Sequence, residues 1–348
     1  MKQTLTRAHS ELFRRTPDER FATFDDLYQH CQRQKERSTD SWLLPHELRT
    51  VPSEGRLDVS LSPTDERLFR LNNWSFSQLC QLAGVSRDTV NRLTPETAAT
   101  VFDETFPDGS KPLQVFSSER NIRSVHGASY TRLHNVELLS LVREFGTDFQ
   151  PPQESGAPGS SGGHGLYCGE QDMFVFLIDP TGWAEIDGEA FAPGFFLWNS
   201  EVGCRSVGVQ TFWFQAVCAN HIVWDAVEVV DFSRKHTANV GDAVREIRRI
   251  IHRLVETRDA RRDGFVRVIR KAMGESIGSD ADETLAFLTK HGIRRALAKE
   301  ALESARTSGR FTMFSVVDAL TRIAGRVPNA GDRTEIDTMA SELLALAR

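Results

Sequence analysis

The sequence predicts an α+β fold, with a central, mostly antiparallel sheet that includes a hairpin and packed helices, followed by a helical C-terminal region. Strand-like apolar runs gather between residues 113 and 232, and helical spacing of apolar residues dominates on either side. No glycine-rich nucleotide-binding motif follows any strand, which argues against a doubly wound sheet. We expect a helical arm over residues 1–41, an α+β core domain over 42–236 and a helical region over 237–348.

The composition is typical of a globular protein rather than a disordered one. Of the 348 residues, 40% are hydrophobic and 26% are charged. No apolar run is long enough to span a membrane, and the polar N-terminus lacks a signal-peptide pattern. Five cysteines, an odd number, fit reduced thiols better than a disulfide framework. We therefore expect a cytoplasmic protein with no membrane partner.

Helices are expected before residue 113. The apolar spacing from Phe21 to Tyr28 predicts one helix, and residues 64–105 predict several more. Within this region, residues 79–93 resemble a DNA-reading helix-turn-helix, with Gly84 at the turn and a serine cap. An ordinary helical hairpin explains the same pattern, and the second helix would carry only Arg87 and Arg92 as cations.

Strands are expected in the centre of the chain. Residues 113–127 alternate as a hairpin whose turn lies at residues 118–121, and Asn135 is expected to cap a helix over 136–145. Residues 150–165, rich in Gly, Ser and Pro, are expected to form a mobile loop. Further strands are expected at 173–178, 183–186, 195–198, 207–218 and 227–232.

The chain after residue 239 is expected to be helical. Val244, Ile247, Ile251 and Leu254 form one apolar stripe, and Gly264 is a candidate break in this element. Later helices are expected at 283–288, 293–305, 314–324 and 334–347.

Polar residues follow two of the strands. Asn199, Ser200 and Glu201 end one apolar run, and Asn220 and His221 end the next. They are expected either to cap backbone groups at the strand ends or to form a polar floor that binds a ligand or a base edge.

Four residues have side chains that zinc favours. They are His164, Cys168, Cys218 and His221, in two closely spaced pairs. Because neither spacing is a zinc knuckle, the pattern favours two small core cysteines with unrelated histidines over a zinc site. No arrangement of a catalytic nucleophile is evident, so we expect no catalytic residue and no cofactor.

Basic residues form the strongest functional pattern. The net charge is -6, yet residues 242–273 contain ten basic and five acidic residues, which permits an anionic partner at one surface. A solvated helix face is the alternative interpretation. We expect a phosphate-tracking groove in which Tyr130 stacks on bases. The candidate nucleic-acid contacts are Arg120, Arg123, Tyr130, Arg132, Arg234, Lys235, Arg245, Arg248 and Arg249.

Several stretches resemble the phage/plasmid-like proteins, a bacterial domain family of unknown function. They are residues 130–135, 165–167, 172–176, 194–203, 218–224, 233–236 and 314–321. The family has no assigned enzymatic activity, and its occurrence in phages and plasmids implies work on DNA. Its order of sheet, hairpin and helix is similar to that of single-strand-annealing recombination proteins, which implies a homo-oligomer.

These observations together predict a non-enzymatic protein that binds single-stranded DNA in annealing, recombination or replication. A zinc-dependent enzyme is the first alternative, and a helix-turn-helix regulator of double-stranded DNA is the second.

Overall fold

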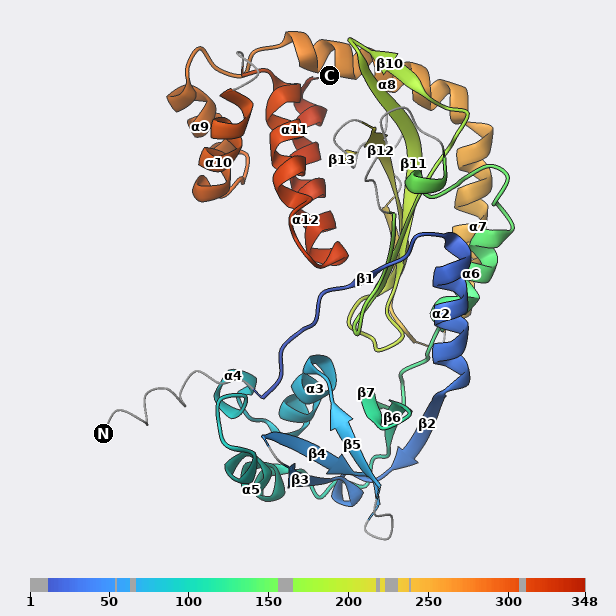
Figure 1. Ribbon diagram of the computed structural model, residues 1–348, viewed down its shortest axis with the longest axis vertical. Coiled ribbons are helices and arrows are strands. Elements are labelled where there is room, and N and C mark those ends of the chain that lie inside the picture. The colour runs from blue at the N-terminus through green and yellow to red at the C-terminus, as the bar shows by residue number, and fades with distance from the viewer. Residues whose placement is uncertain are drawn as a thin grey trace.

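The computed structural model describes residues 12–53, 55–62, 67–155, 165–216, 220–222, 231–237, 239–306 and 311–347. It confirms the α+β class, the mostly antiparallel strands and the helical C-terminal region. The strands form two separate sheets, however, and not the single central sheet that the sequence predicted (Figure 1). We call them the large sheet and the small sheet.

The large sheet is antiparallel throughout, with the order β1-β8-β9-β11-β12-β13; β10 pairs with β11, and β14 pairs with β12. Its long central strands are almost wholly buried, because helices cover both faces. The strands are β1 (Glu19–Arg20), β8 (Leu166–Cys168), β9 (Met173–Ile178), β10 (Ala184–Ile186), β11 (Glu189–Asn199), β12 (Val207–Gln215), β13 (Asn220–Ile222) and β14 (Asp231–Arg234).

Helices α2 (Phe24–Glu36), α6 (Asn135–Arg143) and α7 (Val240–Glu256) cover one face of the large sheet and share a core with it. Helix α12 (Ala330–Ser341) lies against the other face (Figure 1). The far end of the sheet packs through Phe191 and Trp213 onto the C-terminal helices. These are α8 (Arg258–Gly274), α9 (Ala281–Lys290), α10 (Arg295–Ala305) and α11 (Met313–Ala324).

The small sheet has the order β2-β6-β7-β5-β4-β3, with one parallel pair, β5 and β7. Helices α3 (Asn73–Ala83), α4 (Arg87–Val90) and α5 (Pro95–Thr105) complete its hydrophobic core. The strands are β2 (Ser38–Leu43), β3 (Arg49–Ser53), β4 (Arg56–Ser60), β5 (Leu68–Leu71), β6 (Leu113–Ser118) and β7 (Asn121–Gly127). The last two form the expected hairpin, whose turn is at Glu119 and Arg120.

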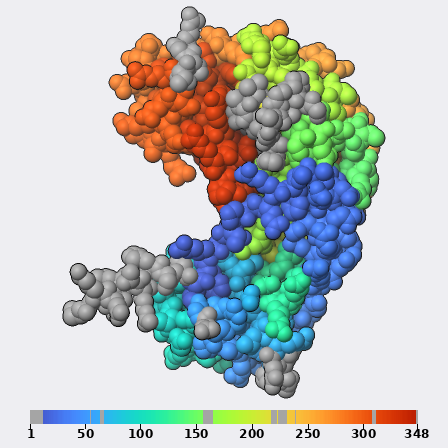
Figure 2. Space-filling model, in the orientation of Figure 1, coloured from blue at the N-terminus to red at the C-terminus, as the bar shows by residue number. Residues whose placement is uncertain are grey.

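Each sheet with its helices forms a lobe, and the space-filling view shows a hollow between the lobes on one side of the molecule (Figure 2). An N-terminal segment, residues 12–20, links the lobes. Phe13 packs on Phe76 in the small-sheet core with ring centroids 4.5 Å apart. Further along the same segment, Asp18 accepts a hydrogen bond from the backbone N–H of Ala330, at the start of α12.

Three local predictions need correction. Helix α4 is a single turn of four residues, too short to lie along a DNA groove as the second helix of a helix-turn-helix. Gly264 lies within α8, and the break occurs instead at Thr257. Asn135 is the first residue of α6 and not its cap, because its side chain is turned toward Asn199. Among the described residues, no helix is both long and apolar enough to cross a bilayer.

Candidate ligand-binding site

The two lobes meet around Glu201, which follows β11 and is 1% exposed. One carboxylate oxygen accepts a 2.7 Å hydrogen bond from Arg123 on β7 of the small sheet, and the other accepts one of 2.7 Å from the backbone of Asn135. Burial alone would raise the pKa of Glu201, but Arg123, the imidazole of His134 and the Asn135 amide outweigh it and hold the pKa at about 2.

The backbone carbonyl of Glu201 is also hydrogen-bonded. It accepts hydrogen bonds from the Tyr130 hydroxyl and from Arg132. Arg132 also pairs with Asp40 at 2.7 Å and lies 3.6 Å above the centre of the Phe116 ring. The predicted cations Arg123 and Arg132 therefore hold the lobes together and are not aligned along an open groove.

Tyr130 is not the open stacking platform that the sequence predicted. Its ring stacks on His126 at 3.7 Å and lies near His236, with centroids 5.6 Å apart. Burial lowers the pKa of both histidines to about 4, so both are neutral near pH 7. Gly203 lies against this stack with φ +71°, and a Cβ there would come within 2.7 Å of His126. The rings therefore pack as part of the junction.

The other predicted nucleic-acid contacts lie apart from one another. Arg245 and Arg249 pair with Asp242 and Glu246 on their own helix, α7, and Arg248 pairs with Glu144. Helix α7 covers one face of the large sheet, whereas Arg120 lies at the turn of the small-sheet hairpin. Arg120, Arg234 and Lys235 are exposed, and the described part of the chain records no ion pair for them. The basic residues therefore do not form the single trough that was predicted.

The two polar strand ends do not form one network either. Asn199 donates to the Leu133 carbonyl and the Asn135 side chain, and Ser200 donates to the Gln171 carbonyl, so this end caps backbone and side-chain groups. Asn220 pairs in register with Gln215 at the opposite end of β12. The side chains of Asn220 and His221 lie outside the described residues.

The zinc prediction falls mostly on residues that the structure does not describe. His164 and Cys218 lie outside the described ranges, as does the side chain of His221. Cys168 is buried in the core beside Cys31, and a hydrogen bond with Cys31, together with burial, raises its pKa well above the usual value. Within the described residues, no group of three or more potential metal ligands is close enough to hold an ion.

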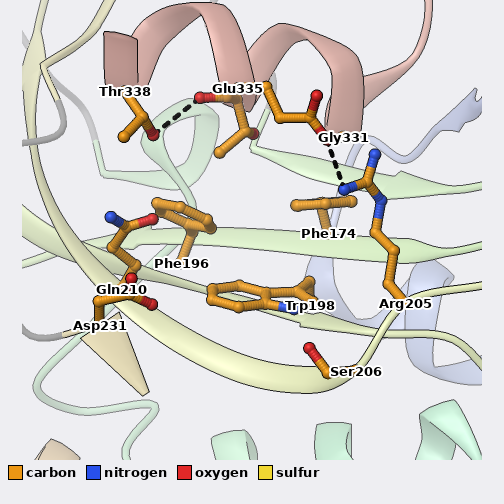
Figure 3. Close-up of a pocket in the computed structure, with 11 residues that line it drawn as sticks. Phe174, Phe196, Trp198, Arg205, Ser206, Gln210, Asp231, Gly331, Glu335 and Thr338 are labelled. Atoms are coloured by element: carbon orange, nitrogen blue, oxygen red, sulfur yellow. Dashed lines mark hydrogen bonds and ion pairs between the residues drawn. The ribbon is translucent and has the colours of Figure 1, made fainter. Parts of the chain in front are cut away.

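A pocket lies between the large sheet and α12 (Figure 3). Its volume is about 490 Å³, within the range of small-molecule sites. Phe174, Phe196 and Trp198 form the floor, and Thr334 and Thr338 of α12 line the opposite side. We call it the aromatic pocket.

The sheet register explains the aromatic floor. Trp198 on β11 pairs with Phe174 on β9 and with Gly208 on β12, so these residues form one row across the sheet. A Cβ at Gly208 would come within 2.2 Å of the Trp198 ring. The indole can therefore lie across β12 because Gly208 has no side chain, and this leaves Trp198 only partly buried, beside the pocket.

The neighbouring row supplies polar groups. Phe196 pairs with Gln210, which pairs with Asp231 on β14. Gln210 is 9% exposed and points into the aromatic pocket, and the described part of the chain records no hydrogen bond to its amide (Figure 3). Because it faces the pocket, this amide is available both to donate to and to accept from a ligand.

Arg205 lies at the other end of the pocket from Gln210 (Figure 3). It donates to Asp172 at 2.9 Å and to Glu335 of α12 at 2.8 Å, and it lies 3.6 Å from Asp332. Its guanidinium therefore ties α12 to the sheet, and three carboxylates surround its charge.

Comparison with known proteins does not assign a family. No family model matches the chain, and neither a curated protein nor a solved structure is similar enough to count as a match. The resemblance to phage/plasmid-like proteins stays a prediction.

The aromatic pocket was not predicted from the sequence, although one signal for it was present. Phe174 and Phe176 alternate on one strand, and Phe196 and Trp198 alternate on another, so each pair faces one side. The glycine opposite Trp198 was the further clue. Only the register between strands shows that these residues meet beneath α12.

Proposed function

We propose that this protein binds a small molecule with a flat heteroaromatic ring, about the size of a nucleoside, in the aromatic pocket. The observation that carries the proposal is the partly exposed Trp198 indole, laid across Gly208 next to the unpaired amide of Gln210. An aromatic floor favours a flat ring by stacking, and a nearby amide favours a ring with donors and acceptors on its edge.

The size and lining of the pocket agree with this ligand class. A volume of about 490 Å³ accommodates a two-ring base with a sugar, and the threonine hydroxyls of α12 provide further polar contacts. The same chemistry applies to a free nucleoside and to one unstacked base of a single strand. These two sources differ in their phosphates, which an experiment can compare directly.

Isothermal titration with adenosine, guanosine, cytidine and uridine tests the proposal. Stacking on an aromatic side chain contributes about 1–3 kcal/mol, so Trp198→Ala is expected to weaken the tightest of these about 5- to 150-fold. Gln210→Leu, which keeps the volume but removes the amide, is expected to weaken it as well. Failure of all four nucleosides to bind would overturn the proposal.

Trp42→Ala is the matched control, because Trp42 is a tryptophan on the small sheet and is 54% exposed. It is expected to leave the affinity unchanged. Equal losses in the Trp42 and Trp198 variants would place binding elsewhere and contradict the proposal. Circular dichroism of each variant checks that the fold is intact.

Single-stranded DNA is the second candidate ligand, as the sequence predicts. The observation that favours it is the exposure of Lys235, directly after β14, the strand whose Asp231 borders the aromatic pocket. A strand with one base in the pocket could place a phosphate near this cation.

An oligothymidine arm of the same titration, repeated across salt concentrations, tests this candidate. Affinity that falls steeply with salt and is reduced in the Lys235→Ala variant would support it. The Arg245→Ala/Arg249→Ala double variant is the control, because those arginines lie on the helix that covers the other face of the sheet. Absent or salt-independent binding would count against DNA.

A further inference from the structure

We infer that the ligand of the aromatic pocket carries no negative charge, and that a positively charged ring binds more tightly than a neutral ring of the same shape. This inference rests on the proposed function and names the charge class of its ligand. Four features carry it: the charges at one end of the pocket, the carboxylate at the other, the aromatic floor and the unpaired amide of Gln210.

Carboxylates outnumber cations at the Arg205 end. Arg205 contacts Asp172, Asp332 and Glu335, and Arg15 also lies 3.3 Å from Asp172 and 3.6 Å from Asp332. The acidic side of this cluster also includes Asp18, 3.9 Å from Arg15. Two guanidinium groups therefore face four carboxylates, and Arg205 has little free charge to offer a phosphate.

The other end of the pocket is also acidic. Asp231 is exposed and lines it, pairing in register with Gln210. Arg234, on the same strand, lies over the ring of Phe232, which packs against the core on the opposite face of the sheet. Arg234 therefore does not neutralise the negative charge of Asp231 within the pocket.

The aromatic floor and the amide of Gln210 add specific contacts for a ring ligand to the negative charge of the pocket. A tryptophan face attracts a cation more strongly than other aromatic rings do, and the indole of Trp198 lies beside the cavity. Gln210, more than nine-tenths buried and without a recorded partner in the described chain, points into the same space. A flat ring that carries a positive charge and a carboxamide or similar polar edge satisfies all of these groups.

Three pyridines of nearly the same size provide the test. Nicotinate is negative, nicotinamide is neutral and 1-methylnicotinamide is positive, and each can be titrated by ligand-observed NMR in parallel with Trp198→Ala. We expect 1-methylnicotinamide to bind about tenfold more tightly than nicotinamide, and nicotinate to bind most weakly. The first two probes share the carboxamide, so their comparison isolates the charge.

Variants of the acidic residues identify the cause. Asp231→Asn and Glu335→Gln are each expected to reduce the preference for 1-methylnicotinamide about threefold or more. Glu104→Gln, an exposed carboxylate on α5 of the small-sheet lobe, is expected to leave it unchanged.

The outcomes separate this inference from the proposed function. If the rings bind in a Trp198-dependent manner but nicotinate is tightest, or if the preference is the same in the Asp231→Asn and Glu335→Gln variants, the charge inference is wrong and the proposed function stands. If neither these probes nor the nucleosides bind, both fail together.

Discussion

At the residue scale, one buried carboxyl on α12, the helix that lines the aromatic pocket, makes the stability of the protein depend on pH. Asp337 of α12 has no exposed surface, and its nearest recorded cation is Arg333, at 3.4 Å. Burial raises the pKa of Asp337 to about 7, although Arg333 opposes the shift. The folded protein therefore keeps this carboxyl protonated at acidities where an unfolded chain has already released the proton.

Asp337→Asn tests this link. Because the folded pKa lies above the ordinary value of 3.8, the contribution of Asp337 to stability falls as the pH rises from about 4 to about 7 and stays lost above that. The free energy of unfolding of the variant, minus that of the unmodified protein, is expected to increase by about 2–3 kcal/mol as the pH rises from about 5 to about 8. Urea unfolding at several pH values measures it, with the exposed Asp108→Asn as control. A difference independent of pH would contradict the prediction.

At the scale of elements, the helix that roofs the pocket depends on a distant segment for its N-terminus. Asn329, at the N-cap of α12, makes no capping hydrogen bond with its side chain. Asp18 provides the missing acceptor, 2.8 Å from the backbone nitrogen of Ala330, and the Asn329 side chain donates to the Thr16 carbonyl. A negative side chain there also favours the helix dipole, so residues 12–20 help to hold α12 over the sheet.

Asp18→Ala is expected to lower the free energy of unfolding by about 1–2 kcal/mol, the usual effect of losing a helix cap. Because α12 lines the aromatic pocket, we also expect weaker binding of the ring ligand. Asp103→Ala, an exposed aspartate within α5, is the control and is expected to have little effect. Urea unfolding and the nucleoside titration together measure both effects. Unchanged stability in the Asp18 variant would show that α12 does not depend on this cap.

At the scale of the whole molecule, the two lobes share one buried acid. Glu201 lies on the large-sheet side and bonds to Arg123 of the small sheet, while the next carbonyl, of Val202, accepts hydrogen bonds from Trp74 and His126. A carboxylate removed from water in this way is tolerated only while its partners remain. The relative position of the lobes, and hence the hollow in Figure 2, therefore depends on this network.

Arg123→Met is expected to destabilise the protein by about 3–5 kcal/mol, because it leaves Glu201 buried without its main counter-charge. Arg248→Met, which breaks an exposed pair with Glu144, is expected to cost less than about 1 kcal/mol. Urea unfolding measures both, and small-angle X-ray scattering shows whether the lobes separate. Adding Glu201→Gln to Arg123→Met is expected to recover part of the loss; no recovery would mean that packing, and not the unpaired charge, dominates.

Local patterns in the sequence were enough to predict most individual elements. Apolar spacing located α2, α7 and α9 to α12, and alternation located the β6–β7 hairpin and the strands β9 and β12. These features depend on neighbours in the chain, because helix and strand periodicity directly reflects which face is buried. The sequence also located Glu201 in a polar stretch after an apolar run, and Arg123 in the predicted hairpin.

The tertiary structure alone decided what those residues do. Charge along the chain suggested a basic groove, but Arg123 and Arg132 are paired with acids distant in sequence, at Glu201 and Asp40. The aromatic pocket likewise depends on the register that places Trp198 opposite Gly208. Pairing across sheets and between distant segments is fixed by the packing of the whole chain, and so no local pattern contains it.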